Sequence, residues 1–136
     1  MHANRDLVEK RIQRELWERV LPLVHPDRRL LTIEAGPDVD HLEALEVGTS
    51  WGAPWGTTWF RLTGGFPTDW AGRRIEAVID LGFHDRAAGF QCEGLVVDLH
   101  DDGTFSPLQG IHPRRTNYAV DAVAGPVTLH VEAASN

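Results

Sequence analysis

Three of the five tryptophans in this 136-residue chain, Trp51, Trp55 and Trp59, fall within nine residues. Large aromatic rings at this density can form a platform for a sugar or for another protein, or they can seal one end of a small hydrophobic core. Glycines and a proline separate the rings, so the segment up to Gly56 is expected to be a tight loop. Both functions stay open on the sequence, and Trp51, Trp55 and Trp70 are the candidate contact residues.

Seven histidines suggest metal binding, but no two of them have the spacing of a ligand pair on a helix or strand. The nearest approach to a cluster is His100-Asp101-Asp102-Gly103, which is ordinary turn chemistry after a strand. The sequence therefore predicts no metal site and no cofactor in this chain.

Nucleophilic catalysis finds no better support. The chain has no Gly-x-Ser-x-Gly motif, and Cys92 falls on the predicted core face, where a thiol is usually inert packing. Twenty acidic residues would suffice for a two-carboxylate glycosidase site, but most alternate on the solvent faces of strands or lie in turns. The chain alone is not predicted to be an enzyme.

The formal net charge is -7, with 20 acids against 13 bases. This balance argues against nucleic acid and anionic membrane surfaces as partners, since both attract positive proteins. No run approaches the roughly 20 apolar residues of a membrane span. A single cysteine cannot form an internal disulfide, and the first residues lack the apolar core of an export signal, so a cytoplasmic location is expected.

Residues 5–24 carry the apolar period of an amphipathic helix. Asn4 is expected to cap its start, and Pro26 to end it, so that the helix stops between Leu21 and His25. Its apolar stripe must pack on this domain's sheet or on another part of a larger protein. The stripe consists of Val8, Ile12, Leu16 and Val20, followed by Leu21, Leu23 and Val24.

The rest of the chain reads as short strands separated by turn residues. Strict alternation predicts strands at 29–35, 75–81 and 127–133, and β-branched and aromatic residues predict another from Thr57 up to Gly64. Segment 38–50 fits a short helix or a poor strand and is taken as a loop.

A hairpin is expected over 89–98, turning at Glu93-Gly94. Glu-Gly is a weaker turn pair than Asn-Gly, because glutamate resists a positive φ. The two pairs that this turn would place on one face are Cys92 with Leu95 and Phe90 with Val97.

Several short strands with regular turn signals predict a mostly β fold, an antiparallel β-sandwich, preceded by one α-helix. The expected division is an N-terminal amphipathic helix over 1–28 and a single sandwich domain over 29–136. The last strand runs almost to the end of the chain, which is typical of a piece cut at a domain boundary.

Five motifs together resemble a known family. They are Trp51-Gly-Ala-Pro-Trp-Gly-Thr-Thr-Trp-Phe-Arg61, Trp70-Ala-Gly-Arg73, Glu76-Ala-Val-Ile-Asp-Leu-Gly-Phe83, Gly89-Phe-Gln-Cys-Glu-Gly-Leu95 and His112-Pro-Arg114. The chain resembles, over residues 5–136, the region ahead of the catalytic domain in bacterial α-mannosidases of glycoside hydrolase family 38. It departs from that pattern by a shorter segment before Trp51 and by Cys92, where a small residue is usual.

The resemblance implies an N-terminal sandwich of the jelly-roll or galactose-binding-like type, followed by a zinc-dependent retaining mannosidase domain. That domain holds zinc through a His-x-His-x-Asp run and uses an aspartate nucleophile. The run does not occur in this chain, so no catalytic or metal-binding role carries over to any residue here. Zinc is expected in the parent enzyme's catalytic domain, which would also be this domain's partner.

Two functions of different classes follow. In the first, the chain is the non-catalytic N-terminal module of a cytoplasmic α-mannosidase that removes terminal α-D-mannosides in carbohydrate catabolism. In the second, it is a free-standing carbohydrate-binding module whose tryptophans stack on mannosides. The first predicts apolar surface that is exposed without the catalytic domain and so favours self-association into a homo-oligomer.

The first function also predicts a domain interface with bidentate arginine contacts to carboxylates. The alternative for the same arginines is a solvated position at a strand edge. The candidate interface residues are Arg61, His112, Arg114 and Arg115.

Overall fold

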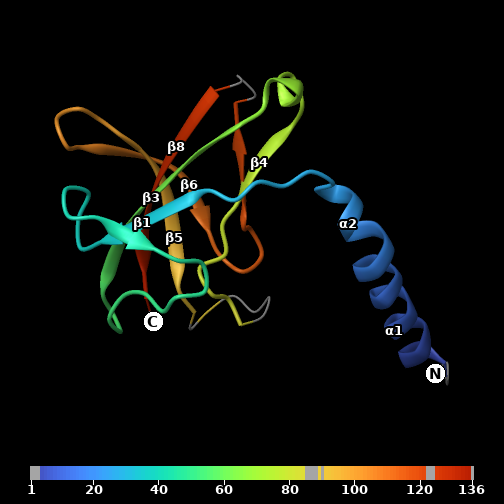
Figure 1. Cartoon of the computed structure of the whole chain (residues 1–136). Coiled ribbons are helices and arrows are strands. Elements are labelled where there is room, and N and C mark those ends of the chain that lie inside the picture. The colour runs from blue at the N-terminus through green and yellow to red at the C-terminus, as the bar shows by residue number, and fades with distance from the viewer. Residues whose placement is uncertain (1–3, 85–88, 90, 122–124, 136) are drawn as a thin grey trace. The chain divides into compact units, whose positions relative to one another are not determined.

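The computed structural model describes residues 4–84, 89, 91–121 and 125–135. It divides into a helical unit, Met1–Leu30, and a β unit, Leu31–Asn136 (Figure 1). The helical unit contains α1 (Arg5–Glu15), a π-helical segment η1 (Leu16–Val20) and α2 (Leu21–Val24), which ends before His25. The predicted helix is confirmed in extent.

The expected cap on this helix is wrong in one respect. Asn4 occupies the N-cap position, but its side chain makes no capping hydrogen bond. Its backbone, with φ -106° and ψ 7°, is not in the extended conformation that aims an asparagine side chain at the first turn. Its carbonyl still accepts a hydrogen bond from the Val8 amide at 3.0 Å.

The wider π turn of η1 ends at Val20, two residues before Pro22. Proline has no amide hydrogen, and its ring crowds the carbonyl four residues earlier, that of Glu18, so a locally wider turn accommodates it. None of the residues in α1, η1 and α2 is buried, and Leu7 and Leu23 are 68% and 74% exposed. The packing of the apolar stripe on this domain's sheet, or on another part of a larger protein, remains a prediction.

The β unit is an antiparallel sandwich, as predicted. One sheet has six strands in the order β2-β1-β3-β8-β5-β6, and the other pairs β4 with β7 (Figure 1). The strands are β1 (Thr32–Gly36), β2 (Glu43–Leu45), β3 (Thr57–Phe66), β4 (Ile75–Val78), β5 (Glu93–Leu99), β6 (Phe105–Ile111), β7 (Asn117–Val120) and β8 (Gly125–Ala134).

Side-chain alternation along these strands builds one core between the two sheets. In β3, Thr58, Phe60 and Leu62 are buried, which places Trp59 and Arg61 on the outer face. The alternation predicted over 75–81 is confirmed in the burial of the side chains, and it continues past Val78, where β4 ends. The buried cluster comprises Phe60, Leu62, Ala77, Ile79, Leu81, Val96, Ile111, Val131 and Ala133.

The hairpin predicted at Glu93-Gly94 is wrong. Both residues lie inside β5, which pairs with β8 on one side and β6 on the other. A Cβ on Gly94 would stand 2.9 Å from Leu81 Cδ1 and 3.1 Å from Val131 Cγ1, so this glycine serves close packing rather than a turn. Phe90, one member of the expected pairs, lies outside the described residues.

The turn that makes a hairpin of β5 lies further along, between Leu99 and Phe105. Gly103 has φ 82°, and the Asp102 carboxylate accepts hydrogen bonds from the Thr104 amide and hydroxyl at 2.9 and 2.6 Å. These bonds lower the pKa of Asp102. An Asp-Gly pair with its side chain folded onto the backbone makes a far better turn than Glu-Gly.

Three strands had no clear signal in the sequence. β2 occupies part of segment 38–50, so the prediction of a loop there is wrong for Glu43–Leu45, and β7 has only four residues. β6 contains Pro107 and lies at the sheet edge, where a missing amide hydrogen is tolerated. Its register shifts between Val96 and Val97, so that Leu108 is the extra residue of a bulge.

Candidate functional site

Several candidate residues from distant parts of the sequence meet at one end of the six-stranded sheet. Thr57, which starts β3, pairs with Ala134 at the end of β8, and Ala134 pairs with Glu93 at the start of β5. Gly94 pairs with Ile111, the last residue of β6. Loop 51–56, Ser135 and turn 112–115 therefore share this end, which we call the exit end because the chain leaves the sheet there (Figure 1).

Loop 51–56 is hydrogen-bonded to Ser135, the residue that follows β8. The Trp55 amide donates to the Ser135 carbonyl at 2.8 Å, and the Ser135 amide donates to the Gly56 carbonyl at 3.1 Å. The Ser135 hydroxyl also donates to the Ala53 carbonyl. The loop and Ser135, which follows β8, thus form one structural unit.

Trp51 belongs to the core. Its indole Nε1 donates to the Leu81 carbonyl at 3.0 Å, and its ring meets Phe60 edge-on, with 5.1 Å between centroids and 84° between planes. Both contacts are of the kind that stabilise buried aromatic residues. Of the two roles open for Trp51, the structure supports sealing of the core.

Trp55, unlike Trp51, lies outside the core. Its side chain is 84% exposed, and its φ of 62° is the only positive one at a non-glycine among the described residues. For a bulky residue the left-handed region costs on the order of 1 kcal/mol. The bonds to Ser135 and the neighbouring loop hold this conformation and leave the ring in solvent.

Trp70 does not join the other two. It lies in the 3-10 turn η2 (Thr68–Trp70), which follows Phe66, and Phe66 pairs with Gly125 at the opposite end of β3. Its ring stacks with the guanidinium of Arg73, whose Cζ lies 5.9 Å from the centroid. Trp51, Trp55 and Trp70 therefore do not form one aromatic platform.

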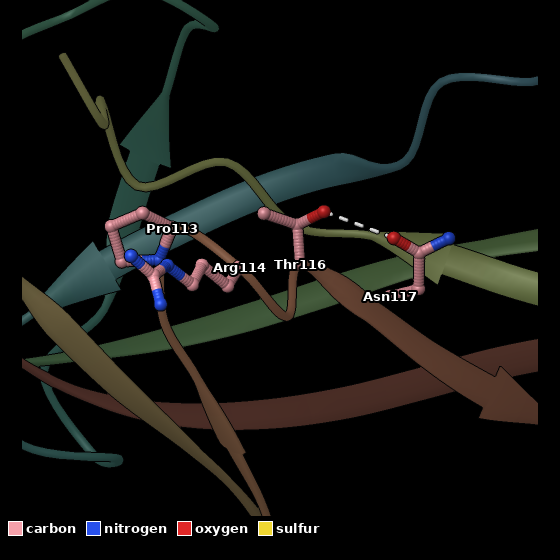
Figure 2. Close-up of a pocket in the computed structure, with 4 residues that line it drawn as sticks. All are labelled: Pro113, Arg114, Thr116 and Asn117. Carbon is pink, nitrogen blue, oxygen red and sulfur yellow. Dashed lines mark hydrogen bonds between the residues drawn. The ribbon is translucent and has the colours of Figure 1, made fainter. Parts of the chain in front are cut away.

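Turn 112–115 carries three of the four basic or imidazole candidates. The Arg115 amide donates to the His112 carbonyl at 2.8 Å, and the Arg114 amide donates to the His112 Nδ1 at 3.3 Å. Pro113 and Arg114, together with Thr116 and Asn117, line an open pocket of about 590 Å³. Figure 2 shows the Thr116 hydroxyl bonded to the Asn117 side chain beside it, at 2.9 Å.

A polar network that includes the pocket residue Asn117 joins the two sheets. Arg115 donates to Gln109 at 3.0 Å, Gln109 donates to the Asn117 carbonyl at 2.8 Å, and Asn117 donates to Glu76 at 2.6 Å. The other oxygen of Glu76 pairs with Arg74 at 2.7 Å. The network links β6, β7 and β4, so its first role is to hold the sheets together.

Replacing Asn117 by alanine is expected to lower the free energy of unfolding by about 2 kcal/mol. The change removes one hydrogen-bond donor from the Glu76 carboxylate, whose side chain is only 13% exposed. Urea unfolding measures the loss. Asn117→Asp, which puts a second carboxylate against Glu76, should cost at least as much, and a neutral result for both would rule out a structural role.

Arg61 lies on the outer face of the sheet, away from the exit end. Its Nε donates to Glu34 Oε2 at 2.7 Å, and this bond lowers the pKa of Glu34. The structure therefore gives Arg61 a carboxylate partner within its own domain. Whether Arg114 and Arg115 meet carboxylates across a domain interface stays a prediction.

The outer face also contains an apolar cluster that the sequence did not indicate. Trp59 on β3 meets Phe105 on β6, with ring centroids 5.2 Å apart, although β8 and β5 lie between their strands. Val97 on β5 is 4% exposed but is not part of the core cluster. Across the same strands, the pairing places four residues in one row: Arg61, His130, Val97 and Pro107.

His130, in this row, has a pKa below its ordinary value of 6.5, first because of burial and then because of the nearby Arg61 charge. An unfolded chain takes up this proton at a higher pH than the folded domain. The free energy of unfolding is therefore expected to fall as the pH drops below about 6.5.

Comparing the wild type with His130→Gln between about pH 8 and about pH 5 isolates this contribution. His41 acts in the opposite direction, because its hydrogen bond to Asp38 raises its pKa, so its stabilising contribution is lost as the pH rises. Identical pH profiles for the two proteins would exclude a contribution from His130.

Cys92, which precedes β5 at the exit end, is not an activated thiol. Cys92 donates to the Leu81 carbonyl at 3.3 Å, and burial raises the pKa of its thiol, which makes it a poor nucleophile. In the described parts of the chain, no three His, Cys, Asp or Glu side chains gather closely enough to hold a metal ion. Among the same residues, no helix has the length and apolarity needed to cross a bilayer.

Comparison with known proteins gave one family match. The model of a family described as "Alpha-mannosidase, jelly roll domain" matches residues 25–136. No curated protein matches the chain. The match begins at the end of the helix and covers the whole sandwich.

Proposed function

Because the chain belongs to the α-mannosidase jelly roll domain family, we propose that it is the non-catalytic N-terminal module of a family 38 α-mannosidase. In this role it supports a catalytic domain that follows it in the same polypeptide. That enzyme would release mannose from terminal α-D-mannosides for carbohydrate catabolism.

The observation that carries the proposal is the family match over the complete sandwich. The arrangement of polar groups supports it. Glu76, the acid next to the pocket residue Asn117, is engaged in structure with Arg74 and Asn117, and no group of three or more His, Cys, Asp or Glu side chains among the described residues could hold a zinc ion. We therefore assign the hydrolytic chemistry, and the zinc that it requires, to the catalytic domain.

The proposal includes further expectations. The parent enzyme would work in the cytoplasm, and its oligomeric contacts would involve apolar surface of this domain such as Leu108 and Val78, which are 51% and 57% exposed. Neither nucleic acid nor a membrane surface is a proposed partner of a chain with a net charge of -7.

The test begins with the reading frame beyond Asn136. We expect it to continue into a domain with a His-x-His-x-Asp run, and the purified parent protein to hydrolyse an aryl α-mannoside. Removing zinc with a chelator should abolish this activity, and adding zinc back should restore it. A parent protein that folds, binds zinc and leaves α-mannosides intact would contradict the proposal.

The exposed ring of Trp55 favours a second candidate, a carbohydrate-binding module, since an exposed indole can stack on a sugar ring. Titration of mannose and mannobiose into the chain separates the two. We expect no binding at millimolar sugar, because Trp51 is used in the core and Trp70 lies at the other end of β3. Millimolar or tighter binding that disappears in Trp55→Ala would favour the carbohydrate-binding module.

A further inference from the structure

We propose that Trp55 is the anchor through which this domain docks on the polypeptide that follows Ser135, with turn 112–115 at the rim of the same interface. This inference rests on the proposed function, in which a catalytic domain follows the jelly roll in the same chain. The partner is accordingly an apolar pocket on that domain, with carboxylates at its edge.

The position of Trp55 relative to the chain exit carries the first step. β8 ends at Ala134, and the Ser135 backbone is bonded to Trp55 and Gly56 on both sides. A polypeptide advances at most about 3.5 Å per residue. Whatever follows Ser135 therefore begins beside loop 51–56 and has Trp55 within reach from its first residues.

The conformation of Trp55 carries the second step. Every other described residue with a positive φ is a glycine, including Gly52 in the same loop, at φ 67°. Trp55 adopts such a conformation although its side chain is 84% exposed. The backbone strain therefore costs free energy that no packing of the indole in the core offsets. Tryptophan is also one of the residues, with tyrosine and arginine, that are enriched among interface residues that dominate binding energy.

Charge and distance carry the third step. The 136-residue chain is acidic overall, with a net charge of -7, but the turn that contains His112, Arg114 and Arg115 follows β6 at the exit end. β6 and β3 are separated by β8 and β5, so the turn stands about 14 Å from the loop along the sheet. An interface of ordinary size, about 800 Å² on each partner, covers both features. Arginines at the rim then face carboxylates of the partner.

Trp55→Gly tests the anchor, because it should act in opposite directions in two proteins. In the 136-residue chain, glycine relieves the strain at φ 62° and removes no packing, so the melting temperature should stay the same or rise. In the parent enzyme, the same change should lower the melting temperature of the jelly roll by about 5 °C, since it removes the anchor. Val47→Ala is the control, because Val47 is an exposed apolar residue, at 72%, in a loop away from the exit end, and it should change neither protein.

Hydrogen exchange in the wild-type proteins gives a second readout that needs no variant. The amides of Gly52, Ala53, Trp55 and Gly56 should exchange at least about 10-fold more slowly in the parent than in the 136-residue chain, whereas those of residues 46–49 should exchange alike. Equal exchange of the first four amides in both proteins, or equal melting of Trp55→Gly and Val47→Ala in the parent, would overturn the anchor.

The remaining outcomes are also decisive. A 136-residue chain that dimerises in light scattering, and becomes monomeric with Trp55→Gly, would make a second copy the occupant and overturn the inference. A parent that hydrolyses α-mannosides but is unaffected by Trp55→Gly would contradict the anchor and leave the proposed function standing. A parent destabilised by Trp55→Gly but inactive on α-mannosides would contradict the proposed function alone.

Discussion

Replacing Trp51 by alanine is expected to lower the free energy of unfolding of the domain by about 3 kcal/mol. The indole packs edge-on against Phe60, which is 6% exposed, and its Nε1 is the donor to the Leu81 carbonyl. Truncation would open a cavity at the exit end and leave that carbonyl without this donor. Urea unfolding monitored by circular dichroism measures the loss.

Two comparisons sharpen this prediction. Trp51→Phe keeps most of the ring packing and loses the hydrogen bond, so it should cost about half as much. Trp55→Ala, a truncation of a tryptophan in the same loop that is 84% exposed, should change the stability of the chain by less than about 0.5 kcal/mol. If Trp51→Ala were as mild as Trp55→Ala, the loop would not seal the core, and its rings would again be free to bind a ligand.

Replacing Gly36 by alanine is expected to cost about 3 kcal/mol. A Cβ at this position would stand 1.8 Å from the carbonyl oxygen of His41, which is backbone and cannot rotate away. The segment that carries this carbonyl is itself fixed, because the Asp38 carboxylate accepts hydrogen bonds from the Asp40 and His41 amides, both at 3.0 Å. Accommodation of the methyl group must therefore disrupt this turn or the end of β1.

Gly110→Ala provides the matched control for this change. Gly110 is also a strand glycine, but an added Cβ would meet nothing within 4 Å, and its backbone φ is not positive. Alanine there should be neutral or slightly stabilising, since it reduces the freedom of the unfolded chain. Similar losses for both variants, measured by thermal unfolding, would show that the cost at Gly36 is not steric.

The sequence predicted the elements in which hydrophobic period and burial agree. Residues 5–24 formed a helix, and the alternation of 75–81 placed Ala77, Ile79 and Leu81 in the core. β6 was not predicted, because Pro107 and a bulge interrupt its alternation and most of its residues are exposed at the sheet edge. The hairpin at Glu93-Gly94 was wrong because a glycine can mark close packing as well as a turn, and only the position of Leu81 and Val131 distinguishes the two.

The candidate site could be predicted only in part. Residue types alone gave Trp51 and Trp55 the same two possible roles. The structure distinguishes them, because Trp51 donates a hydrogen bond to the Leu81 carbonyl and Trp55 has a positive φ. The placement of loop 51–56 and turn 112–115 at the same end of the sheet depends on the register of four strands, which no local pattern encodes. For the same reason, the partner of Arg61 on the neighbouring strand, Glu34, could not be read from the sequence.

The central claim is that this chain is a sandwich domain with no reaction of its own. The most direct test is to incubate the purified 136-residue chain with an aryl α-mannoside, with and without added zinc, beside the parent polypeptide at equal concentration. The account predicts release of the aryl group by the parent and none above the spontaneous rate by the chain alone. Turnover by the chain alone, abolished by substitution of one of its own acidic residues, would contradict it.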